Sequence, residues 1–253
     1  MKKLRYNFIL TILSFFGFSL AFTSCREYID YPVEETPIDL LCTLNIRGGC
    51  LDQWELVDDG NGYKSLEPAG DYLRTLNYLY TLPAAAGGPG PQTTYKADDS
   101  YSGTYAALLV TGEFSPQGSP ILIPGLLGTD SLDIPNATIC VGKPYTSKPA
   151  RFQGYYKYEP VSGDSALVSV LLSKFNTVAG KRDTIALARS VYKDSITSYT
   201  HIDIPINYYS AETPDTLTLL ISSSAGIKLN DLFHCVGRVG SKLWIDEIQF
   251  VMP

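Results

Sequence analysis

The chain has 253 residues with 20 basic and 26 acidic side chains, which gives a formal net charge of −6 at neutral pH. An acidic chain without a basic run argues against nucleic acid or an anionic lipid surface as a partner. Because it contains only two histidines, a histidine-rich metal site is excluded.

The first 24 residues have the pattern of a secretory signal peptide. A basic start, Lys2-Lys3-Leu4-Arg5, precedes an uncharged apolar run from Phe8 to Phe22, and Thr23-Ser24 then precede Cys25. The run is too short for a comfortable membrane span of about 20 residues. We therefore exclude residues 1–24 from the fold, which changes the formal charge to 17 − 26 = −9.

The small residues Thr23-Ser24 followed by Cys25 resemble the lipobox of bacterial lipoproteins, although Phe22 stands where leucine is usual. The resemblance implies that Cys25 is lipidated and that the protein is an outer-membrane lipoprotein of the bacterial cell envelope, attached to the membrane by its lipid alone. The alternative is an ordinary signal peptide with an incidental cysteine. Residues 25–39 are polar and acidic and are broken by Pro32 and Pro37, which predicts a tether.

Four further cysteines follow: Cys42, Cys50, Cys140 and Cys235. In an exported protein an even number of cysteines permits disulfides, here with three possible pairings. A bond between Cys42 and Cys50 would close a short loop and leave Cys140 with Cys235. Buried free thiols are the alternative, and the wide spacing argues against a zinc site.

Residues 40–253 are expected to form one all-β domain, a jelly-roll-like β-sandwich. The apolar runs are short, rich in β-branched and aromatic residues, and separated by turns such as 99–103 and 162–164. The expected strands are 105–111, 151–158, 166–173, 184–191, 199–206, 216–222 and 242–251. The only helical pattern covers 72–80, and the Gly- and Pro-rich segment 83–91 predicts a loop.

Alternation assigns the two faces of segment 199–208. The core face is expected to carry Ile202, Ile204, Ile206 and Tyr208, and the solvated face His201, Asp203, Pro205 and Asn207. Because Pro205 cannot donate a ladder hydrogen bond, this strand is expected at a sheet edge or with a bulge.

The apolar pattern of segment 242–251 changes phase at Asp246-Glu247. A β-bulge there would keep both halves of the strand packed and would re-aim Asp246. Two roles for Asp246 follow. Its oxygens bind a structural calcium ion, or its carboxylate accepts hydrogen bonds from backbone amides.

Segment 151–158, RFQGYYKY, carries three tyrosines within four residues. Alternation predicts a core face with Phe152, Gly154, Tyr156 and Tyr158, and a solvated face with Arg151, Gln153, Tyr155 and Lys157. Tyr155 is therefore the one tyrosine of the three expected to face a ligand.

Several short blocks of the sequence occur in an order that is found in a known family. They are 68–77 (PAGDYLRTLN), 101–111 (YSGTYAALLVT), 123–128 (IPGLLG), 142–158 (GKPYTSKPARFQGYYKY), 204–208 (IPINY), 214–215, 222–224 and 240–246 (GSKLWID). Together they resemble the "putative carbohydrate metabolism domain" (PCMD) of lipoproteins from glycan-foraging bacteria. The resemblance implies a jelly-roll-like sandwich similar to galactose-binding and carbohydrate-binding modules, and it implies no reaction or catalytic set.

Sugar recognition requires an aromatic ring under the apolar face of the pyranose, with amide, carboxylate or guanidinium groups near its hydroxyls. The sequence offers three candidates: Tyr155 with Arg151, Gln153 and Lys157; Tyr209 with Asn207 and Asp203; and Trp54. For each ring, simple cross-strand pairing is the alternative. We therefore expect a carbohydrate-binding module that assists glycan capture.

Two other classes of function are kept. A structural or assembly lipoprotein would bind another envelope protein through a large exposed apolar patch. A glycan-processing enzyme would need two facing carboxylates, for which Asp203, Asp246 and Glu247 are available without any pair standing out. We expect no enzymatic activity, no catalytic residue, and no cofactor other than the calcium considered for Asp246.

A tripeptide of Asp, then Ser or Thr, then an apolar residue resembles the O-glycosylation signal of exported proteins from the same bacterial group. It begins at Asp130, Asp164, Asp183, Asp194 and Asp215. Turn chemistry is the alternative, because Asp-Ser and Asp-Thr often precede strands.

Overall fold

A computed structural model describes residues 45–58, 64–70, 72–77, 90–115, 118–133, 138–227 and 234–253, with backbone alone for 130–133 and 138–141. The expected signal peptide, lipidated Cys25, tether and Cys42 lie outside these residues. In the described part of the chain, no helix is long and apolar enough to cross a membrane.

The described fold consists of eighteen strands. They are β1 (Trp54–Asp58), β2 (Lys64–Pro68), β3 (Arg74–Thr75), β4 (Thr94–Ala97), β5 (Ala106–Val110), β6 (Gly112–Phe114), β7 (Ile121–Ile123), β8 (Leu126–Gly128), β9 (Asp130–Asp133), β10 (Thr138–Val141), β11 (Lys143–Pro144), β12 (Arg151–Glu159), β13 (Ala166–Asn176), β14 (Lys181–Tyr192), β15 (Ile196–Pro205), β16 (Asn207–Tyr208), β17 (Thr216–Ser222) and β18 (Lys242–Val251).

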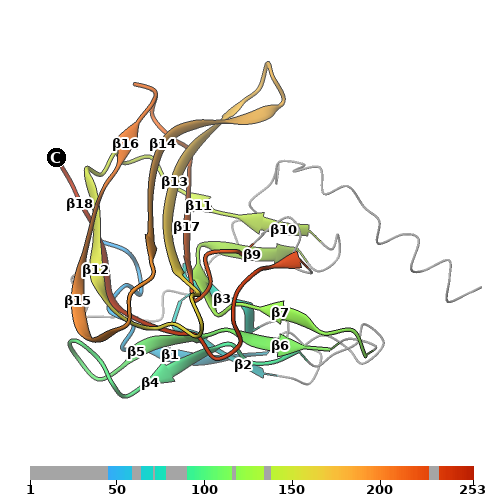
Figure 1. The fold of residues 1–253 in the computed structure, drawn as a ribbon. Coiled ribbons are helices and arrows are strands. Elements are labelled where there is room, and N and C mark those ends of the chain that lie inside the picture. The colour runs from blue at the N-terminus through green and yellow to red at the C-terminus, as the bar shows by residue number, and fades with distance from the viewer. Residues whose placement is uncertain are drawn as a thin grey trace, which may run out of the picture. The chain divides into compact units, whose positions relative to one another are not determined.

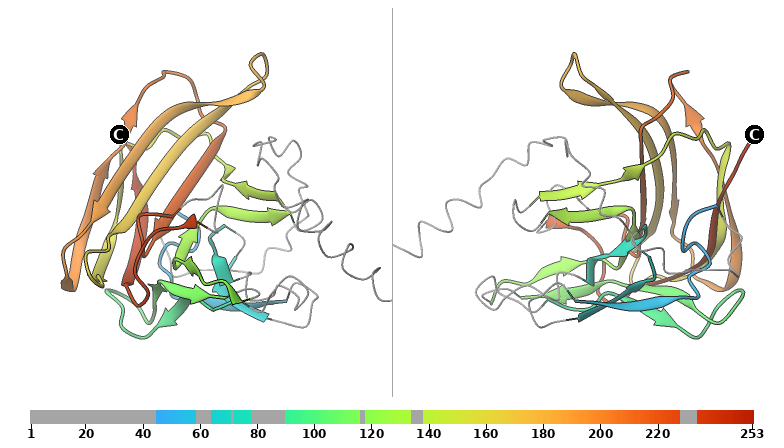
Figure 2. Two further views of the ribbon diagram at one scale, coloured as in Figure 1. Left: turned by 45° about the vertical axis from the view of Figure 1, so that its right-hand side comes forward. Right: turned by 180° about the vertical axis from the view of Figure 1, so that it is seen from behind.

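Two antiparallel sheets form a jelly-roll-like β-sandwich (Figures 1 and 2). The five-stranded sheet has the order β15-β12-β18-β5-β4, and the seven-stranded sheet has the order β16-β14-β13-β17-β8-β3 with β11 beside β17. Their facing sides share one apolar core, in which Phe152, Tyr158 and Ile245 of the first sheet pack with Val170 and Leu219 of the second. The all-β expectation is thereby confirmed.

The expected strands are closely confirmed. The expected helix over residues 72–80 is wrong in its described part, residues 72–77. Segments 216–222 and 242–251 form β17 and β18 with the expected bounds. Within 72–77, Arg74-Thr75 form β3 and only Leu76-Asn77 adopt one short 3₁₀ turn. Segment 78–80 and most of the expected loop lie outside the described residues.

Long-range hydrogen bonds explain why the helical pattern of this segment fails. The backbone N–H and the hydroxyl of Thr75 both donate to the buried Glu67 carboxylate, at 2.9 and 3.0 Å. The Asn77 amide nitrogen donates to the carbonyls of Leu66 and Thr94, at 3.2 and 2.7 Å. These contacts hold the segment extended against β2 and β4, because tertiary contacts override local propensity.

β15 lies at the edge of the five-stranded sheet, as Pro205 predicts. Ile202, Ile204 and Ile206 are buried on its core face. Tyr208 is an exception to the expected face. The chain crosses to the other sheet after Pro205, where β16 pairs with β14, and Tyr208 remains 37% exposed.

The expected bulge at Asp246-Glu247 is present. The pairing of β12 with β18 shifts register between Gln153, opposite Gln249, and Tyr155, opposite Asp246. Glu247 adopts a φ of 49°, which is the left-handed conformation that a bulge residue can take. Ile245 and Ile248 are consequently both buried.

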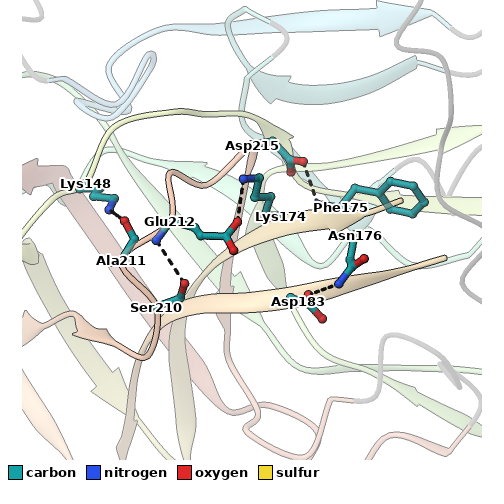
Figure 3. A network of polar contacts seen from close by, with 9 residues as sticks. All are labelled: Lys148, Lys174, Phe175, Asn176, Asp183, Ser210, Ala211, Glu212 and Asp215. Atoms are coloured by element: carbon teal, nitrogen blue, oxygen red, sulfur yellow. Dashed lines mark hydrogen bonds and ion pairs between the residues drawn. The ribbon is translucent and has the colours of Figure 1, made fainter. Parts of the chain in front are cut away.

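The hairpin of β13 and β14 extends past the rest of the sheet, and polar contacts hold the end of β13 and the start of β14, next to the turn that joins them (Figures 1 and 3). The Lys174 ammonium pairs with Glu212 at 2.6 Å, the Phe175 amide donates to Asp215 at 2.8 Å, and Asn176 donates to Asp183 at 2.7 Å. These contacts orient the hairpin, and they do not bring aromatic side chains together into a candidate binding site.

Cys50 is disulfide-bonded. Cys42 lies outside the described residues, and only the backbone of Cys140 is described. The Cys42–Cys50 and Cys140–Cys235 pairings therefore stay predictions.

Candidate functional site

β12 divides its side chains between core and solvent almost as expected. Phe152, Tyr156 and Tyr158 are buried in the core. Gly154 lies among them beside the bulge, where an added Cβ would stand 3.0 Å from Ile248 Cγ2. The outer side of β12 carries Arg151, Gln153, Tyr155 and Lys157.

Lys157 departs from the expectation of a solvated residue, because it is only 8% exposed. Its ammonium lies 4.8 Å from the ring centroid of Tyr199 and 4.7 Å from that of Trp244, and it pairs with the Asp99 carboxylate. Two aromatic rings and a carboxylate thus take the place of water around the cation. Lys157 therefore uses its ammonium group in contacts within the protein rather than presenting it to a ligand.

The ring of Tyr155 is stacked against a second tyrosine. Its centroid lies 3.5 Å from that of Tyr101 with an interplanar angle of 10°. His201 approaches Tyr155 with a centroid distance of 5.2 Å, and Tyr199 meets the edge of Tyr101 at 6.0 Å. Tyr101 is 47% exposed, so Tyr101 is the ring of the stack that presents the most surface to solvent.

Tyr101 reaches this position because residues 98–105, the loop between β4 and β5, fold over the outer face of the sheet. The amides of Tyr101 and Ser102 donate to Asp246 at 2.8 and 3.2 Å. On the other side of the loop, the amides of Thr104 and Tyr105 donate to Asp52 at 2.5 and 2.9 Å. Four backbone amides therefore hold the loop on two carboxylates.

Two further contacts fasten the start of the loop. The Tyr199 hydroxyl donates to the Asp99 carbonyl at 2.6 Å, and the Asp99 carboxylate pairs with Lys157. Burial raises the pKa of Tyr199, and the nearby Asp246 and Asp99 carboxylates raise it further. The hydroxyl is therefore protonated and serves as a donor.

Asp246 is fully buried beneath the loop. Its carboxylate accepts three backbone amides, since Glu247 N–H donates to it at 2.9 Å in addition to those of Tyr101 and Ser102. The expectation of a bulge carboxylate bonded to backbone amides is confirmed. Among the described residues no three metal-ligating side chains cluster, and the calcium role of Asp246 stays an untested prediction.

A polar group adjoins the aromatic stack on the same outer face. Arg151 Nε donates to Asp203 Oδ1 at 2.5 Å, and Gln153 Nε2 donates to the same oxygen at 3.2 Å. The hydrogen bond from Arg151 lowers the pKa of Asp203. Because Gln153 and Asp203 are cross-strand neighbours, as are Tyr155 and His201, amide, guanidinium and carboxylate groups stand two residues along the strands from the rings.

The second expected constellation, Tyr209 with Asn207 and Asp203, is wrong as a group. Asn207 belongs to β16 of the seven-stranded sheet, while Asp203 belongs to β15 of the five-stranded sheet. Tyr209 itself is 67% exposed, and its backbone N–H donates to Ile185 O at 2.9 Å. The change of sheet after Pro205 separates these residues.

Trp54 lies apart from both groups. Its ring is half-buried against the main core, and its indole N–H donates to the Leu51 carbonyl at 2.7 Å. The ring therefore supports the attachment of the β1–β2 hairpin.

Sequence reasoning missed Tyr101 and Tyr199 as members of the outer-face cluster. Tyr199 could have been found, because it shares the alternating face of His201 and Asp203. Tyr101 lies in a turn, and nothing in alternation shows over which face a turn folds.

Comparison with known proteins finds structures of similar fold but assigns the chain to no family. No family model matches the chain, and no curated protein matches it. A "putative glycoside hydrolase" from Bacteroides vulgatus matches with a TM-score of 0.61 at 19% identity, over 80% of this chain and 96% of that one. A "putative glycoside hydrolase" from Bacteroides thetaiotaomicron matches with a TM-score of 0.58 at 19% identity, over 79% of this chain and 69% of that one. At this identity the likeness shows the fold alone.

Proposed function

We propose that the protein is a carbohydrate-binding module whose ligand lies on the outer face of the five-stranded sheet. The observation that carries the proposal is the stack of the exposed Tyr101 on the partly exposed Tyr155, beside the Arg151–Gln153–Asp203 group. A flat ring suits the apolar face of a pyranose, and the adjoining amide, guanidinium and carboxylate groups suit its hydroxyls. The names of the two similar structures agree with a glycan as the ligand class.

An uncharged glycan fits this face better than an acidic one. The Arg151 guanidinium is neutralised by Asp203 and the Lys157 ammonium by Asp99. The whole chain is acidic, so its long-range field repels an anionic polymer.

The carboxyl groups of this face are unsuited to glycoside hydrolysis, which favours a binding function over an enzymatic one. A glycosidase needs a general acid with a raised pKa that can reach the substrate. The pKa of Asp203 is lowered by Arg151, and Asp246 lies beneath the loop. The proposal therefore assigns no catalytic residue.

The envelope location completes the proposal. Lipidation at Cys25 would hold the module at the outer membrane on a short tether, where it assists glycan capture. Mass spectrometry of the native protein tests this part, because an unacylated Cys25 would contradict it.

The binding test is a glycan array with the chain lacking residues 1–25, followed by calorimetry on the hits. Tyr101→Ala and Tyr155→Ala are each expected to weaken binding by about tenfold or more, as expected for an aromatic side chain that the bound ligand covers. Tyr209→Ala is the matched control, because Tyr209 is exposed on the other sheet, and it should leave the affinity unchanged. No binding to any glycan would contradict the function, whereas binding that survives both substitutions would contradict only the site.

A further inference from the structure

The outer face of the five-stranded sheet carries a row of polar side chains that crosses three strands. Gln153 of β12 pairs with Asp203 of β15 on one side and with Gln249 of β18 on the other. Side chains of directly opposite residues in antiparallel strands lie next to one another on the same face of the sheet. These three residues therefore form a continuous polar row, the Asp203–Gln153–Gln249 row.

Gln249 belongs to this row because of the bulge in β18. Ile245 before the bulge is buried in the core, as are Ile248 and Phe250 after it. An unbroken alternation from Ile245 would have placed Gln249 in the core, since side chains of a strand point to one face at every second residue. The bulge thus keeps the core packed and also places an amide on the outer face.

Several polar atoms of the row are available to a ligand. Asp203 Oδ1 accepts hydrogen bonds from Arg151 Nε and Gln153 Nε2. Asp203 Oδ2 and Gln153 Oε1 bond to no other residue in the part of the chain that the structure describes, and the same holds for both atoms of the Gln249 amide. Gln249 is also half-buried, so a hydrogen-bonding ligand would restore contacts that partial burial takes from water.

This set of atoms suits the hydroxyls of a neutral sugar. A hydroxyl both donates and accepts, so it can donate to the free oxygens of Asp203 and Gln153 and accept from the nitrogen of Gln249. A carboxylate or phosphate only accepts hydrogen bonds. Such an anion would meet acceptor oxygens and the negative charge of Asp203, which disfavours it.

The row and the tyrosine stack together are larger than one sugar unit. Gln153 and Tyr155 are two residues apart on β12, which separates their Cα atoms by about 7 Å, and a row across three strands is about 10 Å long. A pyranose ring, built from single bonds of about 1.5 Å, is only about 3 Å across. A sugar unit stacked on Tyr101 therefore leaves most of the row to the unit linked to it.

The row also lies on the open side of the stack. In the other direction along β12, the loop 98–105 covers the sheet, because the Asp99 carboxylate pairs with Lys157 and the Asp99 carbonyl accepts the Tyr199 hydroxyl. A glycan chain that continues from Tyr101 along the strands therefore passes over the row.

We propose that the Asp203–Gln153–Gln249 row is a second sugar subsite beside the Tyr101–Tyr155 stack, and that Gln249 contacts the ligand directly. The ligand is then a chain of at least two neutral sugar units, one on Tyr101 and the next over the row. This subsite rests on the proposed function and adds to it the length of the ligand.

Calorimetry with sugars of increasing length tests the required length. The probes are the monosaccharide, disaccharide and tetrasaccharide of each neutral glycan that binds in the array. We expect the association constant to rise by about tenfold or more from the monosaccharide to the disaccharide, because the second unit adds hydrogen bonds to the row.

A variant that removes only the amide tests the residue. Gln249→Met keeps the length of the side chain, and it is expected to weaken disaccharide binding by about three- to tenfold while leaving monosaccharide binding unchanged. Tyr101→Ala should weaken the binding of both sugars. Asn207→Leu is the matched control, because Asn207 is an exposed amide of β16 in the other sheet, and it should change neither affinity. Gln249→Ala is the second variant in case methionine disturbs the strand.

A monosaccharide that binds as tightly as the disaccharide and the tetrasaccharide overturns the proposal, because one unit then uses the whole site. The proposal is also wrong if disaccharide affinity is unchanged in both Gln249→Met and Gln249→Ala, or if Gln249→Met weakens both sugars equally. The proposed function survives each of these results. Only the absence of binding to any glycan by the wild-type chain contradicts that function, and the second subsite with it.

Discussion

At the scale of single residues, Lys157 shows how a cation becomes part of a β-sandwich surface without remaining solvated. Its ammonium lies near the ring faces of Tyr199 and Trp244 and pairs with the Asp99 carboxylate of the loop. The cost of removing the charge from water is offset by ring faces and a carboxylate. Lys157 is thus a structural residue of the site, although sequence alternation groups it with the ligand candidates.

Replacing Lys157 by methionine tests this role. Methionine keeps the apolar stem and removes the charge, so we expect the free energy of unfolding to fall by about 1–2 kcal/mol. Urea denaturation followed by tyrosine and tryptophan fluorescence measures the change. Lys174→Met is the matched control, because the ion pair of Lys174 with Glu212 is exposed, and it should cost less than about 0.5 kcal/mol. Equal costs for the two variants would contradict the buried-cation account.

At the scale of elements, the bulge in the pairing of β12 with β18 places side chains both in the core and at the candidate site. The bulge returns Ile248 to the core after Asp246 has pointed outward, and Gly154 faces the bulge from β12. A side chain at position 154 would meet Ile248 Cγ2 at 3.0 Å and the Asp246 carbonyl at 3.2 Å. The glycine therefore allows the two strands to stay paired on both sides of the bulge.

Gly154→Ala is expected to destabilise the fold by about 1–2 kcal/mol, because the backbone carbonyl of Asp246 cannot move without disturbing the bulge. Chemical denaturation measures the loss. Gly112→Ala serves as the control: its Cβ would meet Thr93 Cγ2 at an ordinary 3.4 Å, and its stability should change little. A stabilised Gly154→Ala chain would show that the strands adjust freely.

The same pair of strands shows how far sequence reasoning reaches. Period-two alternation found the core face of β12 and the bulge in β18, because burial imposes that period on any half-buried strand. The edge position of β15 is predicted from Pro205, which has no N–H to donate to a neighbouring strand. Alternation did not find that residues 98–105 fold over the sheet, since loop direction is set by amides that meet Asp52 and Asp246, far away in sequence. It also grouped Asn207 with Asp203, because alternation does not show where a chain changes sheet.

At the scale of the whole molecule, the balance of charge and burial sets the pH at which the fold is most stable. The chain has a formal net charge of −6 at neutral pH, so repulsion among carboxylates grows as the pH rises. Burial raises the pKa values of Glu67 and Asp246 above their ordinary values. Both effects favour the folded state at mildly acidic pH.

We expect the free energy of unfolding to decrease from about pH 5 to about pH 8. Asp246 stabilises the fold below its unfolded pKa of 3.8, and this contribution is lost as the pH rises through its folded value of about 7. The loss over this range is about 2–3 kcal/mol. The lowered pKa values of Asp203 and Asp215 act in the opposite direction, but their contributions are lost only as the pH falls through those low values, below the range compared.

The decrease in the free energy of unfolding is measured from the urea concentration at the midpoint of unfolding at each of the two pH values. Urea is chosen as the denaturant because it is uncharged and does not screen charge interactions. Asp246→Asn should remove most of the difference between the midpoints, and the part that remains reports Glu67 and the net charge. Added salt separates these two, since salt screens repulsion among surface carboxylates and leaves the burial of Glu67 unchanged. A midpoint that rises with pH, or a decrease that is the same in Asp246→Asn, would contradict the assignment of this effect to Asp246.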